Sequence, residues 1–206
     1  MKKFLTAIAL LLVTNNAAAG EVSPEVDRGV ASIKQKKFAF SAETKFFSPN
    51  LNAKVKGGDF YFHRTEAPEF LFKYKNFSAD YIRARDTLHF VKLKVDKKIF
   101  SLMGTGLEWN VALNSVTWRG EKNYSTILPS VGINFYMRIR PRLDIYAQFS
   151  SMTLAGHGHF KDFESGVKYF SQKNFSLSAG WRRVDYKFRR GNFSMGGLFA
   201  GVRYDF

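Results

Sequence analysis

Apolar and polar side chains alternate along most of the chain after residue 37, and this alternation limits the possible folds more than any other feature. The clearest run covers residues 127–139. Its apolar positions are Pro129, Val131, Ile133, Phe135, Met137 and Ile139, and its polar positions are Ser130, Gly132, Asn134, Tyr136 and Arg138. Successive side chains of a β-strand point to opposite faces, so this run predicts a strand with one apolar and one polar face.

The same alternation recurs in 107–114, 143–150, 175–182 and 198–206, and no helical repeat interrupts it. The pattern predicts an all-β chain of sequentially connected strands. A soluble β-sandwich would also show apolar-in, polar-out strands, and it remains an alternative on alternation alone. A transmembrane β-barrel uses the same alternation with the apolar face outward.

The N-terminus carries an export signal, which favours the membrane barrel over the sandwich. Lys2 and Lys3 precede an apolar stretch of about ten residues and the small residues Ala17, Ala18 and Ala19. This order is typical of a cleaved signal peptide, and the stretch is shorter than the ~20 residues of a spanning helix. We therefore expect a signal peptide at 1–19, a periplasmic lead-in at 20–36 and a barrel at 37–206. The lead-in is either flexible or a short amphipathic helix.

Composition supports export to a membrane. The chain has no cysteine, which excludes a disulfide-stapled scaffold and thiolate metal sites. It has 22 Phe and 9 Tyr, enough for aromatic girdles at both membrane interfaces. Its 32 Lys and Arg outnumber 17 Asp and Glu, which favours anionic partners. Nucleic acid is not expected, because the chain is exported and carries no recognised nucleic-acid-binding motif.

We expect an antiparallel up-and-down barrel of ten strands, because a chain that starts and ends in the periplasm needs an even number. The expected strands cover 37–47, 58–64, 69–79, 87–96, 99–118, 125–139, 142–155, 161–171, 174–189 and 194–206. An eight-stranded barrel is the alternative if the weak segment 58–64 and a neighbour are loops. The expected periplasmic turns are 65–68, 96–98, 140–142 and 171–174, and the outer loops are 48–57, 80–86, 119–124, 156–160 and 190–193.

The last eighty residues resemble a known family. The sequences DFESGVKYF, NFSLSAGWRR and FAGVRYDF are similar to small outer-membrane β-barrel proteins of proteobacteria without an assigned function, and the first half of the chain, with APEFLFKYKNF, agrees more loosely. The resemblance implies a fold and a compartment, and it supplies no catalytic residues. The last strand also resembles the signal read by the barrel-assembly machinery, with Gly201, Tyr204 and Phe206 as its elements. Phe199 departs from that signal, where a polar residue is usual.

Charged side chains on the polar faces should line the barrel interior. Nine of the fourteen are basic, and we expect a water-bridged network of ion pairs among them. The expected interior set is Glu43, Lys45, Lys73, Lys75, Lys92, Lys94, Glu108, Arg138, Asp144, Glu164, Lys168, Arg182, Arg203 and Asp205. A narrow anion-preferring channel is one alternative to a purely structural network.

A second basic group lies toward the expected outer loops. Its members toward one loop are Arg182, Arg183, Lys187, Arg189 and Arg190, and Arg83, Arg85, Arg119 and Lys122 lie toward others on the same side. Of these, Arg182, Arg183, Arg189 and Arg190 are the expected phosphate-binding residues, and Arg182 therefore belongs to both expected sets. Cations at this depth can bind the phosphates of lipopolysaccharide through charge-assisted hydrogen bonds. Outer-membrane lipids and lipopolysaccharide are accordingly the expected partners, together with the barrel-assembly machinery during biogenesis.

We expect no catalytic residues, no metal site and no cofactor. His157 and His159 stand near Ser150, Ser151 and Asp162, but their spacing matches no known hydrolase. His63 and His89 lack a carboxylate pattern around them. The expected function is thus a non-enzymatic outer-membrane barrel, structural or lipopolysaccharide-interacting, with a lipid A-modifying enzyme as a further alternative.

Overall fold

The structure is a computed structural model that describes residues 40–55, 58–62, 65–119, 124–154, 158–172, 174–188 and 191–206. The chain divides into two units, 1–34 and 35–206, and all described residues belong to the second. The expected signal peptide and the lead-in at 20–36 lie outside the described residues. No helix among the described residues is long and apolar enough to cross a membrane.

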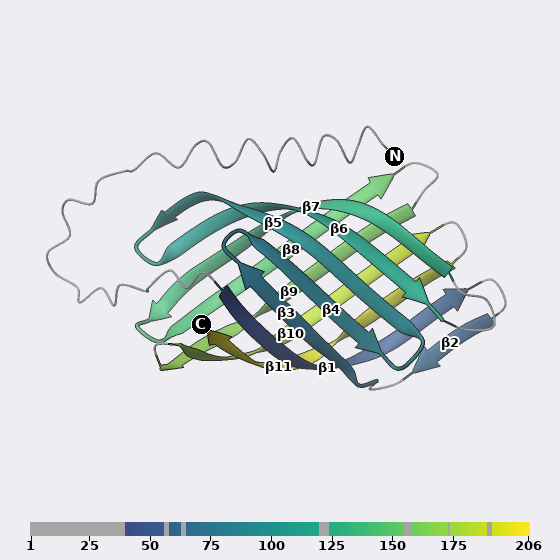
Figure 1. The fold of residues 1–206 in the computed structure, drawn as a ribbon, viewed down its shortest axis with the longest axis horizontal. Helices are drawn as coiled ribbons and strands as arrows, with labels where there is room; N and C mark the ends of the chain where they lie inside the picture. The colour runs from purple at the N-terminus through teal and green to yellow at the C-terminus, as the bar shows by residue number, and fades with distance from the viewer. Residues whose placement is uncertain are drawn as a thin grey trace, which may run out of the picture. The chain divides into compact units, whose positions relative to one another are not determined.

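The second unit is a closed antiparallel β-barrel with ten strands in its wall (Figure 1). Each strand pairs with the next along the chain, except that β2 pairs only with the far half of β1, and β3 takes the near half. The strands are β1 (Phe40–Val55), β2 (Gly58–Phe62), β3 (Ala67–Tyr74), β4 (Phe77–Ala84), β5 (Leu88–Leu102), β6 (Thr105–Trp118), β7 (Tyr124–Arg140), β8 (Leu143–Leu154), β9 (Gly158–Gln172), β10 (Phe175–Phe188) and β11 (Gly191–Asp205).

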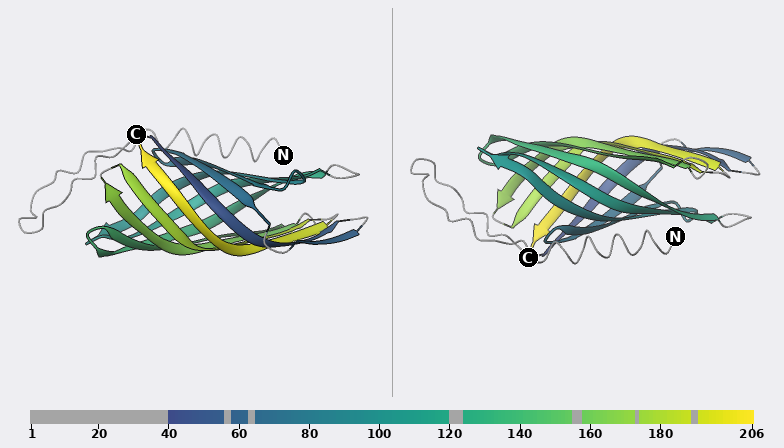
Figure 2. Two further views of the ribbon diagram at one scale, coloured as in Figure 1. Left: turned by 90° about the horizontal axis from the view of Figure 1, so that it is seen from below. Right: turned by 90° about the horizontal axis from the view of Figure 1, so that it is seen from above.

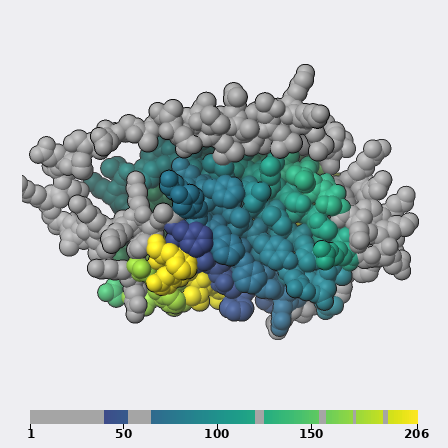
Figure 3. Space-filling view, in the orientation of Figure 1, coloured from purple at the N-terminus to yellow at the C-terminus, as the bar shows by residue number. Residues whose placement is uncertain are grey.

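The first and last strands close the barrel. β11 pairs with β1 along its whole length, from Ser41 opposite Asp205 to Val55 opposite Gly191. Figure 2 shows the two strands side by side in the wall, and Figure 3 shows the residues at the end of β11 packed beside the start of β1. At this seam the Phe206 amide donates to the Phe40 carbonyl at 3.0 Å, and the two rings pack with centroids 5.2 Å apart.

The two ends of the barrel differ. The connections at one end have two to five residues, whereas the hairpins β3–β4, β5–β6, β7–β8 and β9–β10 each turn through two residues at the end where β1 starts and β11 finishes. We call this the turn end, and the opposite end the loop end. Short turns face the periplasm in barrels of this kind, so the loop end is the one expected on the outer side.

Apolar side chains cover the outside of the wall, as the alternation predicted. On β7 the side chains of Ile127, Val131 and Ile133 are exposed, while Ser130 and Leu128 are buried inside the barrel. Aromatic residues gather on the outside at the turn end: Phe40, Phe72, Tyr74, Phe77, Tyr169, Tyr204 and Phe206. A soluble sandwich would hide these faces against a second sheet, so the described residues exclude that alternative.

Several expected strand limits were wrong, although the wall does contain ten strands. Residues 58–64 do not form a wall strand, because β2 pairs with β1 only and only along the far half of that strand. The expected strand 69–79 is two strands, β3 and β4, joined by a turn at Lys75 with a φ of 52°. A ten-strand wall therefore results from one strand gained and one lost.

The expected turn at 96–98 was also wrong. β5 continues to Leu102 and turns at Met103 and Gly104, whose φ angles of 48° and 81° are those of a type I′ hairpin. The polar run at 96–98 resembles a turn, but the Asp96 side chain is buried inside the barrel between Lys73 and Lys94. The expected turns at 140–142 and 171–174 fall between consecutive strands and are confirmed.

Candidate functional site: the barrel interior and the loop-end surface

Apolar side chains fill the half of the interior nearer the loop end. Phe160 packs between Phe90 and Tyr186, with ring centroids 6.0 and 5.8 Å away, and Tyr186 stacks on Phe193 at 5.5 Å. We call this group the apolar plug. It consists of Leu51, Ile82, Leu88, Phe90, Val116, Trp118, Leu128, Phe160, Val184, Tyr186, Phe193 and Met195, all of them buried.

Buried charges form a layer directly below the apolar plug. We call this layer the charge cluster: Lys45, Glu69, Asp80, Lys92, Asp162, Glu164 and Arg182, from six different strands. Arg182 lies at its centre and is only 2% exposed. Its guanidinium pairs with Asp80 at 2.9 Å and with Asp162 at 3.0 Å, and lies 2.6 Å from Glu69, a close ion pair rather than an aligned hydrogen bond.

The two lysines complete the charge cluster. Lys45 Nζ lies 2.7 Å from Glu164 and 3.1 Å from Glu69, and Lys92 Nζ lies 2.8 Å from Asp162. Tyr146 adds a hydroxyl that donates to Glu164 at 2.9 Å. Because charges without water are costly unless paired, these contacts fix the side chains and tie distant strands together across the interior.

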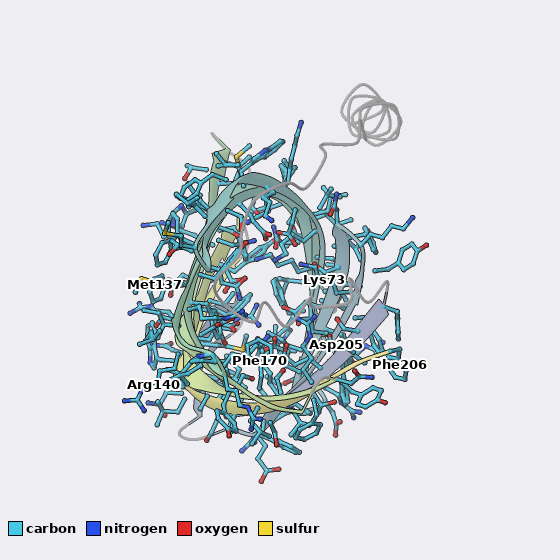
Figure 4. The ribbon with its side chains drawn as sticks, turned by 90° about the vertical axis from the view of Figure 1, so that its left-hand side faces the viewer. Lys73, Met137, Arg140, Phe170, Asp205 and Phe206 are labelled. Carbon is cyan, nitrogen blue, oxygen red and sulfur yellow. The ribbon has the colours of Figure 1, made fainter. Side chains whose placement is uncertain are left out.

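The half of the interior nearer the turn end is polar and reached by water. We call it the vestibule. Asp96 accepts from Asn134 at 2.8 Å and pairs with Lys94 at 3.2 Å, and Arg138 pairs with Asp144 at 2.9 Å. The Arg138 and Lys73 side chains are about a third exposed, at 36% and 33%. Figure 4, seen along the barrel from this end, shows Lys73, Phe170 and Asp205 on the inside and Met137, Arg140 and Phe206 outside.

Most of the expected interior set is inside the barrel. The prediction that basic residues outnumber acidic ones there was wrong. Lys75 lies in the β3–β4 turn, with its Nζ 5.4 Å from the centre of the Tyr74 ring. Four buried carboxylates were missing from the set: Glu69, Asp80, Asp96 and Asp162. Asp80 and Asp96 were missed because they were placed in a loop and a turn. With them included, acidic and basic groups are nearly equal in number, and many pair directly rather than through water.

The expected members of the interior set keep their places otherwise. Glu43 accepts from Ser178 at 2.9 Å and lies 3.7 Å from Lys168, and Arg203 pairs with Asp205 at 2.7 Å. Glu108 lies opposite Asn134 on the neighbouring strand, on the polar face of β6. Lys45, Lys92, Glu164 and Arg182 belong to the charge cluster.

The expected lipid-phosphate group was wrong for Arg182. Its guanidinium is buried inside the barrel among carboxylates and cannot reach a lipid. Arg183 points outward and pairs with Asp185 at 2.9 Å. The side chains of Arg189 and Arg190 lie outside the described residues. Arg183 shares the outside of the loop end with Lys187, which was expected there, and with Lys161, which was not; both lysines are exposed and stand on the same outward face of β9 and β10.

The residues considered for a hydrolytic triad lie apart. Ser150 and Asp162 are buried in the interior, whereas His159 bonds Thr153 at 2.9 Å on the outward face of its strand. His63 and His157 lie outside the residues whose side chains are described. His89 bonds the Tyr81 hydroxyl at 2.8 Å. No group of three or more possible metal ligands occurs within the part of the chain that the structure describes.

The residues of the expected assembly signal lie in the seam strand β11. Tyr204 and Phe206 are exposed on the outside, with ring centroids 4.9 Å apart. Gly201 faces inward, where a Cβ would lie 2.6 Å from Ser178 Oγ and 2.9 Å from Lys45 Cγ. Phe199, the departure from the signal, is buried inside with Lys45 Nζ 4.9 Å from its ring centre. The unusual aromatic residue thus packs against a buried cation.

Comparison with solved structures gives the fold. The outer membrane protease OmpT from Escherichia coli aligns over 81% of this chain and 96% of its own, with 11% identity and a TM-score of 0.51. Neisserial surface protein A aligns over 82% and 97%, with 16% identity and a TM-score of 0.31. Ail from Yersinia pestis aligns over 81% and 99%, with 12% identity and a TM-score of 0.32. No family model and no curated protein matches the chain.

The likeness to OmpT shows that this chain has the fold of an outer-membrane β-barrel. At 11% identity it shows the fold and nothing about activity. The chemistry of the interior and of the outer surface therefore has to be argued from the residues themselves.

Proposed function

We propose that this protein is an integral, non-conducting barrel of the bacterial outer membrane that binds lipopolysaccharide on its outside and catalyses no reaction. The observation that carries the proposal is the division of the molecule into an apolar outer face and a closed interior. An apolar outer face requires a bilayer around it. A closed interior leaves only the outside of the barrel and its loops to bind a partner.

The outer face supports insertion in a bilayer. Many large apolar side chains are exposed there, including Phe46, Leu198 and Ile127 at 69%, 70% and 59%. Each such side chain is stabilised by about 1.5–3 kcal/mol when it leaves water. The closed wall leaves no strand edge inside the membrane, and the aromatic residues at the turn end suit one interface. The expected export signal and assembly signal favour the outer membrane.

The closed interior argues against the channel alternative. An ion entering from the turn end would meet paired charges first and then the apolar plug. The charge cluster and the plug are both almost inaccessible to solvent; Glu69 and Glu164 are each 1% exposed, and Phe90 and Phe160 are fully buried. Moving a free ion past these groups would require breaking buried ion pairs and separating packed rings.

The loop-end surface supports lipopolysaccharide binding. Lys161, Arg183 and Lys187 stand on the outside of β9 and β10, beyond the lipid-facing rings of Phe163 and Trp181, which lie 5.9 Å apart. One carboxylate, Asp185, lies among them. Cations placed just beyond an apolar belt are suited to the phosphates of lipid A, whose acyl chains would cover the belt. Each cation contributes about 1 kcal/mol near an anionic surface.

The test removes these cations together. Lys161→Gln, Arg183→Gln and Lys187→Gln in one chain should lower lipopolysaccharide affinity about tenfold or more, since each contact is modest but all three face the same layer. The matched control, Lys161→Arg, Arg183→Lys and Lys187→Arg, keeps the charge and should bind like the parent. Heat-modifiable migration in detergent gels checks that all three proteins are folded. Parent-like binding by the neutral variant at low salt would reject the lipopolysaccharide proposal.

A further inference from the structure

Exposed cations surround the turn end of the barrel, and none of them is paired with a carboxylate among the described residues. They are Lys75, Lys97, Arg140 and Arg142, whereas Lys98 stands opposite Glu108 on the inward face of β5 and β6. The described carboxylates nearest to them, such as Asp96, Asp144 and Asp205, turn into the vestibule and pair there. The two exposed carboxylates of the described chain, Glu66 and Asp86, lie at the loop end. The turn-end rim is therefore basic on its outside.

Two of the cations come together at the start of β4. The Asp96 amide donates to the Asn76 carbonyl at 2.8 Å, which places the β3–β4 turn with Lys75 beside Lys97 on β5. The exposed rings of Tyr74 and Phe77 lie next to them in the same hairpin. This arrangement has two positive groups beside an apolar and aromatic surface.

The other cations lie beside a second apolar surface. Arg138 donates its amide to the Gly104 carbonyl at 2.9 Å, so the β5–β6 turn lies alongside the end of β7, where Arg140 begins the next turn. Leu102, Met103 and Ile139 are exposed there, with Met103 at 94%. Figure 4 shows Arg140 projecting away from the barrel.

We propose that this basic rim binds anionic phospholipids of the inner leaflet, with the headgroup phosphate at the cations and the acyl chains on the adjoining apolar side chains. A phospholipid carries a negative phosphate next to apolar acyl chains, and the rim carries cations next to apolar residues, so the two surfaces are complementary. A soluble anion would use the cations but not the exposed Leu102, Met103 and Phe77 beside them. The inference rests on the membrane placement proposed above, and it is independent of lipopolysaccharide binding.

The test compares phosphatidylglycerol with phosphatidylethanolamine of the same acyl chains, retained by the folded mature protein in native mass spectrometry. Each cation near an anionic surface contributes about fivefold to binding. Lys75→Gln, Lys97→Gln and Arg140→Gln together should reduce the preference for phosphatidylglycerol about tenfold or more. The control, Arg83→Gln, Arg85→Gln and Arg119→Gln, removes the same charge at the loop end and should keep the preference.

Results of two kinds would overturn the proposal. One is an unchanged preference in the turn-end variant, or an equal loss in the control, because either would show that position does not matter. The other is competition by soluble glycerol phosphate as effective as that by the lipid, because the apolar surface would then contribute nothing. Bilayer insertion and lipopolysaccharide binding, measured on the same samples, separate a failure of this inference from a failure of the proposed function.

Discussion

The two halves of the barrel interior follow the same alternation but contain different chemistry. Near the loop end the inward positions are apolar and pack without water, as Phe90, Phe160 and Tyr186 do. Near the turn end they are charged and partly exposed, as Arg138 and Arg203 are. The charge cluster separates the halves. The comparison shows that the inward face of a barrel strand does not have to be polar along its whole length. It also shows that packed side chains can exclude water from one half of a small barrel while the other half stays open to solvent.

The largest expected effect is at the boundary between the halves. Arg182→Met leaves Glu69, Asp80, Asp162 and Glu164 with only two lysines in a region that excludes water. Leaving buried charges without a partner costs about 3–5 kcal/mol, and denaturant unfolding in lipid vesicles should show a loss of that size. Arg203→Met in the vestibule should cost no more than about 1 kcal/mol, because this pair with Asp205 is partly exposed and screened. Similar losses of unfolding free energy in the two variants would mean that charges in the two halves are equally exposed to water, which contradicts the comparison.

A slightly smaller effect is expected within the apolar plug. Phe160→Ala removes a fully buried ring that contacts Phe90 and Tyr186, and should cost about 3 kcal/mol of unfolding free energy. Phe170→Ala, on the inward face at the turn end, should cost about 1 kcal/mol, since water can replace that partly exposed ring. If the Phe170 variant were the less stable of the two, side-chain packing would contribute more to stability in the turn-end half than in the loop-end half, contrary to this account.

The next comparison concerns the two faces of one strand. Ile133→Arg places a charge on the lipid-facing side of β7 and should cost about 2–4 kcal/mol near the bilayer midplane. Asn134→Arg places it inside, within reach of Asp96, which Asn134 now contacts at 2.8 Å. The second variant should unfold with nearly the parent free energy. Equal losses would mean that the faces have been assigned wrongly.

Alternation in the sequence was enough to predict the two faces of the strands, and the expected export signal and the aromatic last strand were needed to predict a closed membrane barrel. Ile133 outward and Asn134 inward follow from the period of two, and Phe206 at the seam follows from the terminal aromatic strand. Turn positions were harder to predict from the sequence. The polar run from Asp96 to Lys98 resembles a turn, but its aspartate is paired inside the barrel.

The interior arrangement could not be predicted from one sequence. Arg182 was expected both inside and on the outer rim, and only the register of β10 against β9 places it opposite Glu164. The apolar plug joins Phe90 and Phe160, which are seventy residues apart along the chain and meet across the barrel. Such contacts depend on strand stagger and closure, which alternation does not encode.

Ion conductance across a planar bilayer tests the closed interior most directly. The chain, shown to be folded by its heat-modifiable migration and reconstituted in the bilayer, should give no current steps above those of the bilayer alone at either polarity. The charge cluster and the apolar plug block the path in series, so Phe160→Ala alone should also stay silent. Stable, salt-dependent current steps from the folded parent would contradict a closed interior and restore the channel interpretation.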